Sequence, residues 1–187
     1  MKTPELTDED IVKYAKGWSR GDKESFSKLY DFYVDNIYRF IYFKVHSEDA
    51  EDLTELVFIK AWEKRKKYNS KKGAFSSWIY TIARNTVIDH YRVRKETSEL
   101  HENIQDDKKR SDPQRLAEES LSAEKLRSAI AKLPPNYRDV LLLRFIEDMD
   151  YSEISKTLGK TEGAVRITQF RALKELRKVI ENMGFHM

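Results

Sequence analysis

Apolar side chains recur every three or four residues along most of this chain, which is the period of an amphipathic helix. Thr7, followed three residues later by Asp10, resembles a capping box that begins a helix ending near Arg20. The dipeptide Gly21-Asp22 interrupts the pattern. A second helix follows, with an apolar stripe on Phe26, Leu29, Tyr30, Tyr33, Ile37, Tyr38 and Ile41. These segments predict a helical start to the fold.

Two more helices are predicted before residue 96. Ser47 is placed to cap the first of them. Its inner stripe is Leu53, Leu56, Val57, Phe58 and Ala61. A polar loop over residues 66–73 separates this helix from a long one over residues 75–95. The pattern therefore predicts an all-α domain of four helices.

The pattern changes after residue 95. Residues 96–111 hold few large apolar side chains and a mixed-charge run, which predicts a flexible linker. Asp112-Pro113 has the pattern of a cap followed by proline at the first helical position, and this helix extends to about Lys132. Pro135 can begin the next helix, which carries Tyr137, Val140, Leu141 and Phe145. We predict two small helical domains joined by a flexible linker.

Residues 151–180 have the pattern of a helix-turn-helix. Ile154 and Leu158 lie on the inner side of a short helix, and Gly159 can adopt the left-handed backbone conformation that ends it. Thr161 is placed to cap a long second helix. Its inner face holds Val165, Thr168, Ala172, Leu176 and Val179. Its outer face holds Ile167, Phe170, Arg171, Lys174 and Lys178, with Arg166 and Arg177 at the edge. Cations beside exposed apolar residues suit the DNA major groove, although a solvated surface helix has a similar pattern.

The amino-acid composition and the absence of known motifs argue against several kinds of site and function. The 187 residues are 40% hydrophobic and 36% charged, which fits a folded helical protein. There is no cysteine, and the four histidines are scattered, so we expect no disulfide and no metal site. No nucleotide-binding glycine loop or nucleophile elbow is present, so we expect no catalysis and no cofactor. The polar, acidic N-terminus does not resemble a signal peptide, and no apolar run is long enough to cross a membrane, so we expect a cytoplasmic protein.

The net charge is only +3, but it is unevenly distributed. Residues 60–95 hold eleven Lys or Arg and two acids, and residues 160–178 hold six and two. Residues 96–119, between them, hold eight acids and four bases. This alternation suggests two separate contacts with nucleic acid, joined by a stretch that avoids phosphate.

The helix over residues 75–95 has the side chains that unpaired DNA requires. One side holds Phe75, Trp78, Ile79, Ile82 and Thr86, and Trp78 is expected to be in the core. The other side holds Ser77, Tyr80, Arg84, Ile88, Tyr91, Arg92 and Lys95, with Asn85 at the border. Cations bind phosphates, and aromatic rings stack on exposed bases. The neighbouring basic loop, with Asn69, Lys71 and Lys72, could close over an unstacked base, or it could be only a solvated loop.

Acidic residues gather at the start of the helix that follows Ser47. Residues 46–55 hold five acids and no Lys or Arg. Acids do not favour contact with DNA, and together with apolar neighbours they suit a basic protein surface. Acids at the start of a helix also stabilise the helix through its dipole, and this effect requires no binding partner. Spacing alone leaves both interpretations open.

Several of these segments together resemble the extracytoplasmic-function (ECF) sigma factors of the sigma-70 family of bacterial transcription initiation factors. Residues 49–62, DAEDLTELVFIKAW, resemble the segment that docks on the RNA polymerase clamp helices. Residues 75–85, FSSWIYTIARN, resemble the promoter-melting segment, and residues 86–95 resemble the −10 reading helix. Leu133-Pro134, residues 138–141, residues 151–158 and residues 163–166 resemble the −35 reading domain.

The resemblance implies an organisation and a set of partners. Residues 1–95 would form region 2, residues 96–111 a linker, and residues 112–187 region 4. The partners would be core RNA polymerase, promoter DNA (a −35 duplex and a melted −10 strand) and an anti-sigma factor. The chain would not enter a membrane itself, although an anti-sigma factor could hold it there.

The resemblance also implies roles for individual residues. Polymerase docking would use Asp49, Glu51, Asp52, Leu53, Glu55, Leu56 and Phe58. Contacts with the −10 strand would use Asn69, Lys71, Lys72, Tyr80, Arg84, Asn85, Ile88, Tyr91, Arg92 and Lys95. Contacts with the −35 duplex would use Thr161, Arg166, Ile167, Phe170, Arg171, Lys174 and Lys178.

This chain departs from the family pattern at a few positions. The docking motif usually has Gln and then Glu before Val-Phe, where this chain has Glu55 and Leu56. Ile167 and Gln169 are also less usual, and they bear on which −35 sequence is recognised.

Two other functions remain open at this stage. A stand-alone helix-turn-helix regulator that binds DNA as a dimer would explain the C-terminal domain, but it would leave the basic, aromatic helix over residues 75–95 without a role. A protein-interaction module that uses the acidic helix would show no salt-sensitive affinity for DNA, even with polymerase present.

Overall fold

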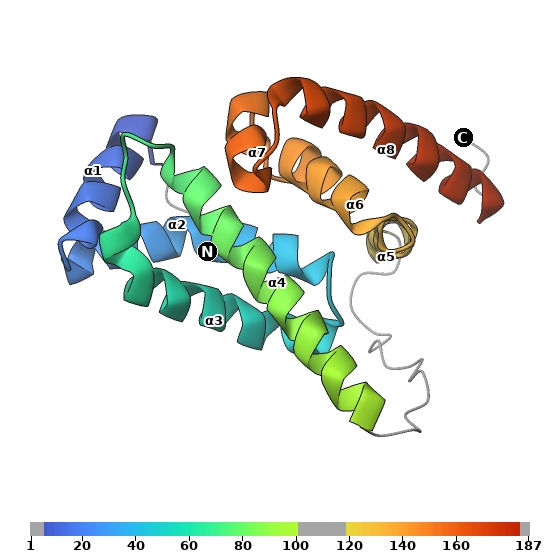
Figure 1. Ribbon diagram of the computed structural model, residues 1–187, viewed down its shortest axis with the longest axis horizontal. Helices are drawn as coiled ribbons and strands as arrows, with labels where there is room; N and C mark the ends of the chain where they lie inside the picture. Colours follow the sequence, from blue (N-terminus) through green and yellow to red (C-terminus); the bar gives the residue numbers. More distant parts are fainter. Residues whose placement is uncertain (1–5, 101–118, 184–187) are drawn as a thin grey trace.

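The computed structural model describes the backbone of residues 6–100 and 119–183, and the side chains of residues 6–95 and 124–183. Every regular element in these ranges is helical, as predicted, and the helices form two groups (Figure 1). The first group is α1 (Asp8–Ser19), α2 (Lys23–Tyr42), α3 (Ser47–Lys64), the short η1 (Arg65–Lys67) and α4 (Phe75–Leu100). The second group is α5 (Glu119–Ala131), α6 (Pro135–Leu141), η2 (Leu142–Ile146), α7 (Tyr151–Leu158) and α8 (Glu162–Asn182). Within these described ranges, no helix is both long enough and apolar enough to cross a bilayer.

Several helix ends form for the reasons expected from the sequence. Thr7 and Asp10 make the predicted capping box at α1, and Pro135 is at the start of α6. Gly159 ends α7 with φ +63°, in the left-handed region that glycine adopts without strain. The Thr161 hydroxyl then accepts a hydrogen bond from the backbone N–H of Ala164 at 3.2 Å, which caps α8.

Other expectations about the helices were wrong. Ser47 is the first residue of α3 rather than its cap, and His46 holds the cap position without a side-chain hydrogen bond. Leu56, expected in the inner stripe, is 37% exposed because it lines an open pocket at the edge of the contact between α3 and α4. The helix α4 extends to Leu100 instead of ending at Lys95, so residues 96–100 of the predicted linker are helical. Residues 101–111 of that linker, and the predicted cap at Asp112-Pro113, lie outside the described residues.

The core of the first group is built on aromatic rings. Trp18 of α1 is fully buried and packs against Phe75 and Trp78 of α4, with ring centroids 5.3 and 5.1 Å apart. Tyr68, which follows η1, lies 5.7 Å from Trp78. Such edge-to-face pairs each contribute roughly 0.5–1.5 kcal/mol beyond their buried area. They fix α4 and the loop before it against α1.

The two groups of helices pack on each other through α4 and α2. The helix α7 lies along α4, and η2 contacts α2. Buried side chains from both groups, such as Ile79 of α4 and Ile154 of α7, belong to one continuous apolar core. A smaller cluster of Leu133, Leu141 and Ala172 holds α6 to α8. This arrangement decides which of the predicted functional side chains are exposed.

Candidate nucleic-acid interface

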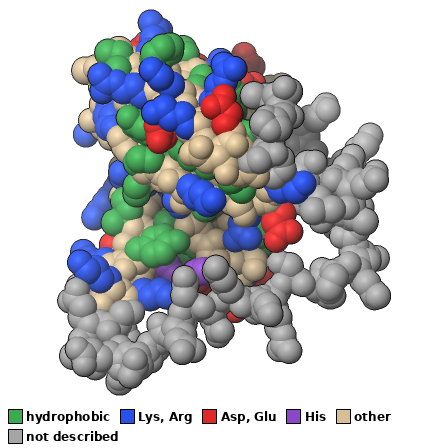
Figure 2. All heavy atoms as spheres, turned by 90° about the vertical axis from the view of Figure 1, so that its right-hand side faces the viewer, with side chains coloured by type: hydrophobic (Ala, Val, Ile, Leu, Met, Phe, Trp, Pro, Cys, Tyr) green, Lys and Arg blue, Asp and Glu red, His purple; other side chains and the backbone are tan. Residues whose placement is uncertain are grey.

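The outer face of α8 has the exposure that DNA contact requires. Val165 and Ala172 are fully buried on its inner face, whereas Ile167 and Phe170 are 56% and 72% exposed. All seven residues predicted for duplex contact are exposed: Thr161, Arg166, Ile167, Phe170, Arg171, Lys174 and Lys178. Figure 2 shows Lys and Arg side chains among hydrophobic ones over the upper part of the molecule, where α8 lies. An apolar surface of this kind beside cations suits a groove that offers both phosphates and thymine methyl groups.

Tyr151 at the start of α7 helps to position Arg166 on the outer face of α8. The sequence alone did not indicate this role. The guanidinium carbon of Arg166 lies 4.6 Å from the centre of the Tyr151 ring, and that of Arg144 lies 5.5 Å from it. Glu162 pairs with Arg166 on the other side, at 3.4 Å. Stacking and pairing restrict the rotamers of Arg166. The arginine is therefore pre-oriented at the turn between α7 and α8.

The C-terminal half of α4 carries most of the exposed residues that were predicted to contact the −10 strand. Five of the predicted residues are exposed: Asn85, Ile88, Tyr91, Arg92 and Lys95. Tyr91 is 43% exposed, and its hydroxyl donates to the backbone carbonyl of Lys44. That bond fixes the partly exposed ring at the edge of the surface.

Tyr80 does not lie exposed for base stacking, so that expectation is wrong for this structure. Its side chain is 2% exposed, its ring packs edge-on against Phe40 at 5.3 Å, and its hydroxyl donates to the Glu147 carboxylate. Burial, with Glu147 alongside, raises the pKa of the Tyr80 phenol well above its usual value. Glu147 directly follows η2, 67 residues later in the chain, so the helical period of α4 cannot reveal this contact.

Arg84 is also held by the second group of helices. Its Nε donates to an oxygen of Asp139 at 2.7 Å, and Asp139 accepts from the Lys44 ammonium through its other oxygen. Asp139 and Lys44 are buried, at 4% and 8% exposure. Burial lowers the pKa of Lys44, although the Asp139 carboxylate opposes this effect. The buried Lys44 and Asp139 and the partly exposed Arg84 therefore form an ionic cluster at the base of the predicted −10 surface.

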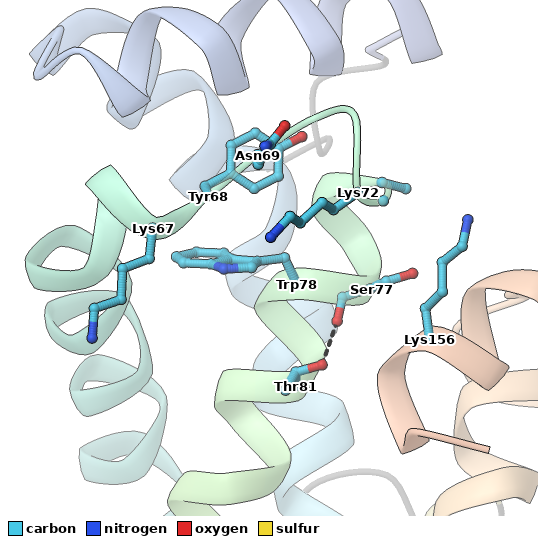
Figure 3. Close-up of a pocket in the computed structure, with 10 residues that line it drawn as sticks. Lys67, Tyr68, Asn69, Lys72, Ser77, Trp78, Thr81 and Lys156 are labelled. Carbon is cyan, nitrogen blue, oxygen red and sulfur yellow. Dashed lines mark hydrogen bonds between the residues drawn. The ribbon is translucent and has the colours of Figure 1, made fainter.

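The basic loop before α4 closes one side of a pocket of about 180 Å³ (Figure 3). The predicted residues Asn69, Lys71 and Lys72 are exposed on this loop, and Asn69 accepts a hydrogen bond from the backbone N–H of Lys71 at 2.9 Å. Tyr68 and Trp78 supply the aromatic wall. Trp78 is therefore both part of the core, as expected, and part of the pocket. An aromatic wall beside lysines suits a base with its phosphate.

Lys156 of α7 also lines this pocket, and sequence reasoning did not identify it. It lies 83 residues or more from the loop in the sequence but faces the same cavity in Figure 3. Only the packing of α7 on α4 brings it there.

The acidic start of α3 divides into exposed and buried positions. Glu51, Asp52, Glu55 and Leu56 are exposed, as docking would require. Leu53 and Phe58 are 7% and 5% exposed, so they support the surface more than they form it. Asp49 is partly buried and paired with α4, 3.4 Å from Arg94. The predicted docking residues therefore do not all face one partner.

An apolar groove of about 690 Å³ lies between α2 and α3. Its floor is Phe26, Tyr30, Phe58, Ile59 and Trp62. Ile59 is 55% exposed, and Glu55 and Glu63 lie on the rim. Ile59 and Trp62 lie inside the docking segment predicted from the sequence, residues 49–62, but they were not named among the individual docking residues. Lys23 also lines the groove. An exposed apolar groove with a charged rim is typical of a protein-binding surface.

Two family models match separate parts of the chain. The model for sigma-70 region 2 matches residues 29–97, which cover most of α2, all of α3 and most of α4. The model for sigma-70 region 4 matches residues 123–176, from α5 into α8.

Individual proteins are also similar. The ECF RNA polymerase sigma factor BldN of Streptomyces coelicolor is 32% identical over 163 residues, which are 86% of this chain and 62% of BldN. The RNA polymerase sigma factor YlaC of Bacillus subtilis is 30% identical over 160 residues, which are 83% of this chain and 92% of YlaC. The chain thus spans about three fifths of one curated relative and most of the other.

One solved structure has a similar fold. It is the sigma factor RpoE of Bartonella quintana in complex with the anti-sigma factor NepR. The match covers 84% of this chain and 98% of that chain, with a TM-score of 0.73 and 19% identity. At this identity the likeness concerns the fold.

Proposed function

Because the chain belongs to the extracytoplasmic-function sigma factors of the sigma-70 family, we propose that it binds core RNA polymerase and directs it to promoters with −35 and −10 elements. A sigma factor is not an enzyme. It supplies the contacts that select the start of transcription, while the polymerase performs the chemistry.

The observation that carries this proposal is the separation of three surfaces on one chain. The exposed cationic face of α8, the exposed half of α4 and the acidic apolar face of α3 lie on different elements. A regulator that only binds DNA has no use for the groove between α2 and α3. A protein-interaction module has no use for the face of α8.

The −35 duplex would be recognised by the turn and outer face of α8. The contributing residues would be Thr161, Arg166, Ile167, Phe170, Arg171, Lys174 and Lys178. Arginine suits guanine, because its two donors match the two acceptors at the guanine edge, and apolar side chains suit thymine methyl groups. Lysines near the helix end would bind phosphates and set the orientation.

The melted −10 strand would be held by α4 and the loop before it. The contributing residues would be Asn69, Lys71, Lys72, Arg84, Asn85, Ile88, Tyr91, Arg92 and Lys95. Tyr80 could join them only after η2 has moved away from it. A base that leaves the stack would enter the pocket walled by Tyr68 and Trp78.

Polymerase docking would use the exposed side of α3. Glu51, Asp52 and Glu55 would face a basic partner surface, with Glu55 beside the apolar groove between α2 and α3, and Leu56 would contribute apolar contact on the α4 side of α3. We include Ile59 and Trp62 in this docking surface because they line the same groove.

The domain limits and the regulation are part of the same proposal. Residues 1–95 would act as region 2, residues 112–187 as region 4, and residues 96–111 as the connection. An anti-sigma factor would block these surfaces, and the RpoE of Bartonella quintana is bound to such a partner, NepR, in its solved structure. The chain would act in the cytoplasm, and an anti-sigma factor in the membrane could hold it there.

Reconstitution with purified core RNA polymerase tests the proposal. Core enzyme with this chain should produce transcripts from discrete promoters that core enzyme alone does not produce, and sequencing the transcript starts would reveal the shared −35 and −10 elements. If no promoter-specific transcript is formed, the proposed function is wrong. Palindrome-specific binding by a free dimer would instead support the stand-alone regulator.

A further inference from the structure

The pocket beside the start of α4 is lined by lysines from both groups of helices (Figure 3). We propose that in the chain without polymerase this pocket binds a nucleoside polyphosphate, with the base against the aromatic wall and the phosphates at the lysines. This ligand is distinct from the melted −10 strand proposed above for the same pocket. Its binding requires neither polymerase nor promoter DNA, so it can be measured separately from the proposed function.

Three lysines from three elements line the pocket. Lys67 is the last residue of η1, Lys72 lies in the loop before α4, and Lys156 is on α7. All three are exposed, and none has an ion pair among the residues whose side chains are described. No Asp or Glu is among the described residues that line the cavity. Such a cavity favours a ligand with several negative charges, because each phosphate can pair with its own ammonium group.

Lys156 reaches the pocket because α7 packs on α4. A Cβ on Gly73 would lie 3.5 Å from Cδ of Lys156, so the alkyl stem of the lysine lies against the loop before α4. Figure 3 shows Lys72 extending over Trp78, and Lys156 approaching from the side of α7. The pocket is therefore complete only where the two groups of helices meet.

The inner wall of the pocket suits an aromatic base. The ring centroids of Tyr68 and Trp78 are 5.7 Å apart, and both rings pack against the buried Trp18, which fixes their positions. The cavity volume of about 180 Å³ equals that of about six water molecules in the liquid. This space accommodates one base, whereas the sugar and the phosphates would remain at the mouth, where the lysines are.

Two polar side chains in the pocket have hydrogen-bonding capacity left for the edge of a base. The Thr81 hydroxyl donates to the Ser77 carbonyl oxygen at 2.7 Å, so its oxygen is left to accept. The Asn69 side-chain oxygen accepts from the backbone N–H of Lys71 at 2.9 Å, so its amide group is left to donate. A base in the pocket thus meets both a donor and an acceptor.

The start of α4 adds positive potential to that of the lysines. Ala74 precedes the helix, and its carbonyl accepts from the backbone N–H of Trp78 at 3.3 Å. Alanine has no side chain that can cap the first N–H groups of the helix, and these groups carry the positive end of the helix dipole. Gly73 and Ala74 both line the pocket. This effect supplements the lysines and would not make a site alone.

Calorimetric titration of the full chain with each of the four nucleoside triphosphates tests the proposal. At least one of them should bind, and inorganic triphosphate should bind about fivefold or more weakly, because a stacked base adds affinity. Absence of binding by all four at millimolar concentration would overturn the proposal. Equal affinity for inorganic triphosphate would also overturn it, because the lysines would then bind any anion.

Substitution of single lysines locates the site. Lys72→Ala and Lys156→Ala should each weaken binding about twofold to fivefold. Lys160→Ala is the matched control, because Lys160 is an exposed lysine of the same half that does not line the pocket, and its affinity should equal that of the wild type. All three side chains are exposed, so urea unfolding should give the wild-type midpoint for each variant. Equal affinities of the three variants would place the nucleotide elsewhere and overturn the proposal.

The outcomes for the nucleotide and for promoter recognition are distinguishable. Nucleotide binding without any promoter-specific transcript in the reconstitution would refute the proposed function and leave this site in place. Promoter-specific transcription without nucleotide binding would do the reverse. If both are observed, a bound nucleotide would exclude the −10 base from the pocket, a consequence that rests on the proposed function.

Discussion

Asp49 near the start of α3 lies 3.5 Å from Nε2 of His90 in α4, with Arg94 Nη1 at 3.4 Å on the same oxygen. The contact with His90 is an ion pair when the imidazole is protonated, and it does not have hydrogen-bond geometry. The acid therefore joins the docking helix to the helix proposed to contact the −10 strand. Asp52, less than one turn later, is exposed and has no ion pair among the residues with described side chains.

This difference predicts separate effects for two neighbouring acids. Asp52→Ala should weaken binding to core polymerase by about 0.5–2 kcal/mol and leave the unfolding midpoint unchanged. Asp49→Ala should lower the free energy of unfolding by up to about 1 kcal/mol, because it removes a partly exposed ion pair between α3 and α4. Titration of fluorescently labelled protein with core polymerase and urea unfolding measure the two quantities. Equal effects of both variants on polymerase binding, with no change in stability, would assign Asp49 to docking alone.

Arg171 is exposed on the outer face of α8, and we expect it to contact the −35 element. If it contacts a base, Arg171→Ala should weaken binding by about 1–3 kcal/mol and reduce selectivity at one position. The measurement is binding of holoenzyme to a set of promoters with single substitutions in the −35 element. Uniform weakening on every sequence would make Arg171 a phosphate contact instead.

Arg177→Ala is the matched control for this prediction. Arg177 is on the same helix but pairs with Glu181 at 3.1 Å, away from the turn. Its removal should change promoter affinity by less than about 0.5 kcal/mol. A loss as large as that from Arg171 would show that general charge, not position, controls affinity.

Local sequence signals predicted the helices well, because each depends on residues close together in the chain. The Thr7–Asp10 capping box, the left-handed Gly159 and the Thr161 cap each involve groups within three or four residues. The all-α class and the exposed face of α8 follow from the helical period, which the burial of Val165 and Ala172 confirms.

The contacts between the two halves could not be predicted in this way. Tyr80 lies on the polar side of α4 by period, yet it is buried because Glu147, 67 residues later, covers it. Lys156 reaches the pocket beside Trp78 for the same reason. Leu56 shows the reverse error, since an apolar residue at helical spacing stays 37% exposed at the open edge of the contact between α3 and α4.

Gly159 should be more sensitive to substitution than Gly163, four residues later. A Cβ would meet nothing within 4 Å at either position, so only the backbone conformation differs. Gly159 has φ +63°, and Gly159→Ala should destabilise the fold by roughly 1 kcal/mol. Gly163 is inside α8, and Gly163→Ala should stabilise the fold by up to about 1 kcal/mol. Urea unfolding of both variants checks the difference, and destabilisation of both by the same amount would contradict it.

Glu147 predicts a pH dependence of stability. Burial raises the pKa of this carboxyl from its usual 4.5 to about 7, and the Tyr80 hydroxyl and Arg39, 3.8 Å away, oppose the rise. Between these two values the folded chain holds a proton that the unfolded chain has released. The contribution of Glu147 to stability is therefore fully present below pH 4.5, falls as the pH rises to 7, and stays low above it. The loss is at most about 3 kcal/mol.

Glu147→Gln isolates this contribution, because glutamine keeps an oxygen that accepts the Tyr80 hydroxyl but does not titrate. The free energy of unfolding of the variant minus that of the wild type should be about 1–3 kcal/mol larger at pH 8 than at pH 5. Taking the difference between the two proteins cancels the titration of all other groups. Urea unfolding at the two pH values gives the result. A difference that does not change with pH would mean that the Glu147 carboxyl is ionised at pH 5, as it would be if η2 did not bury it against α4.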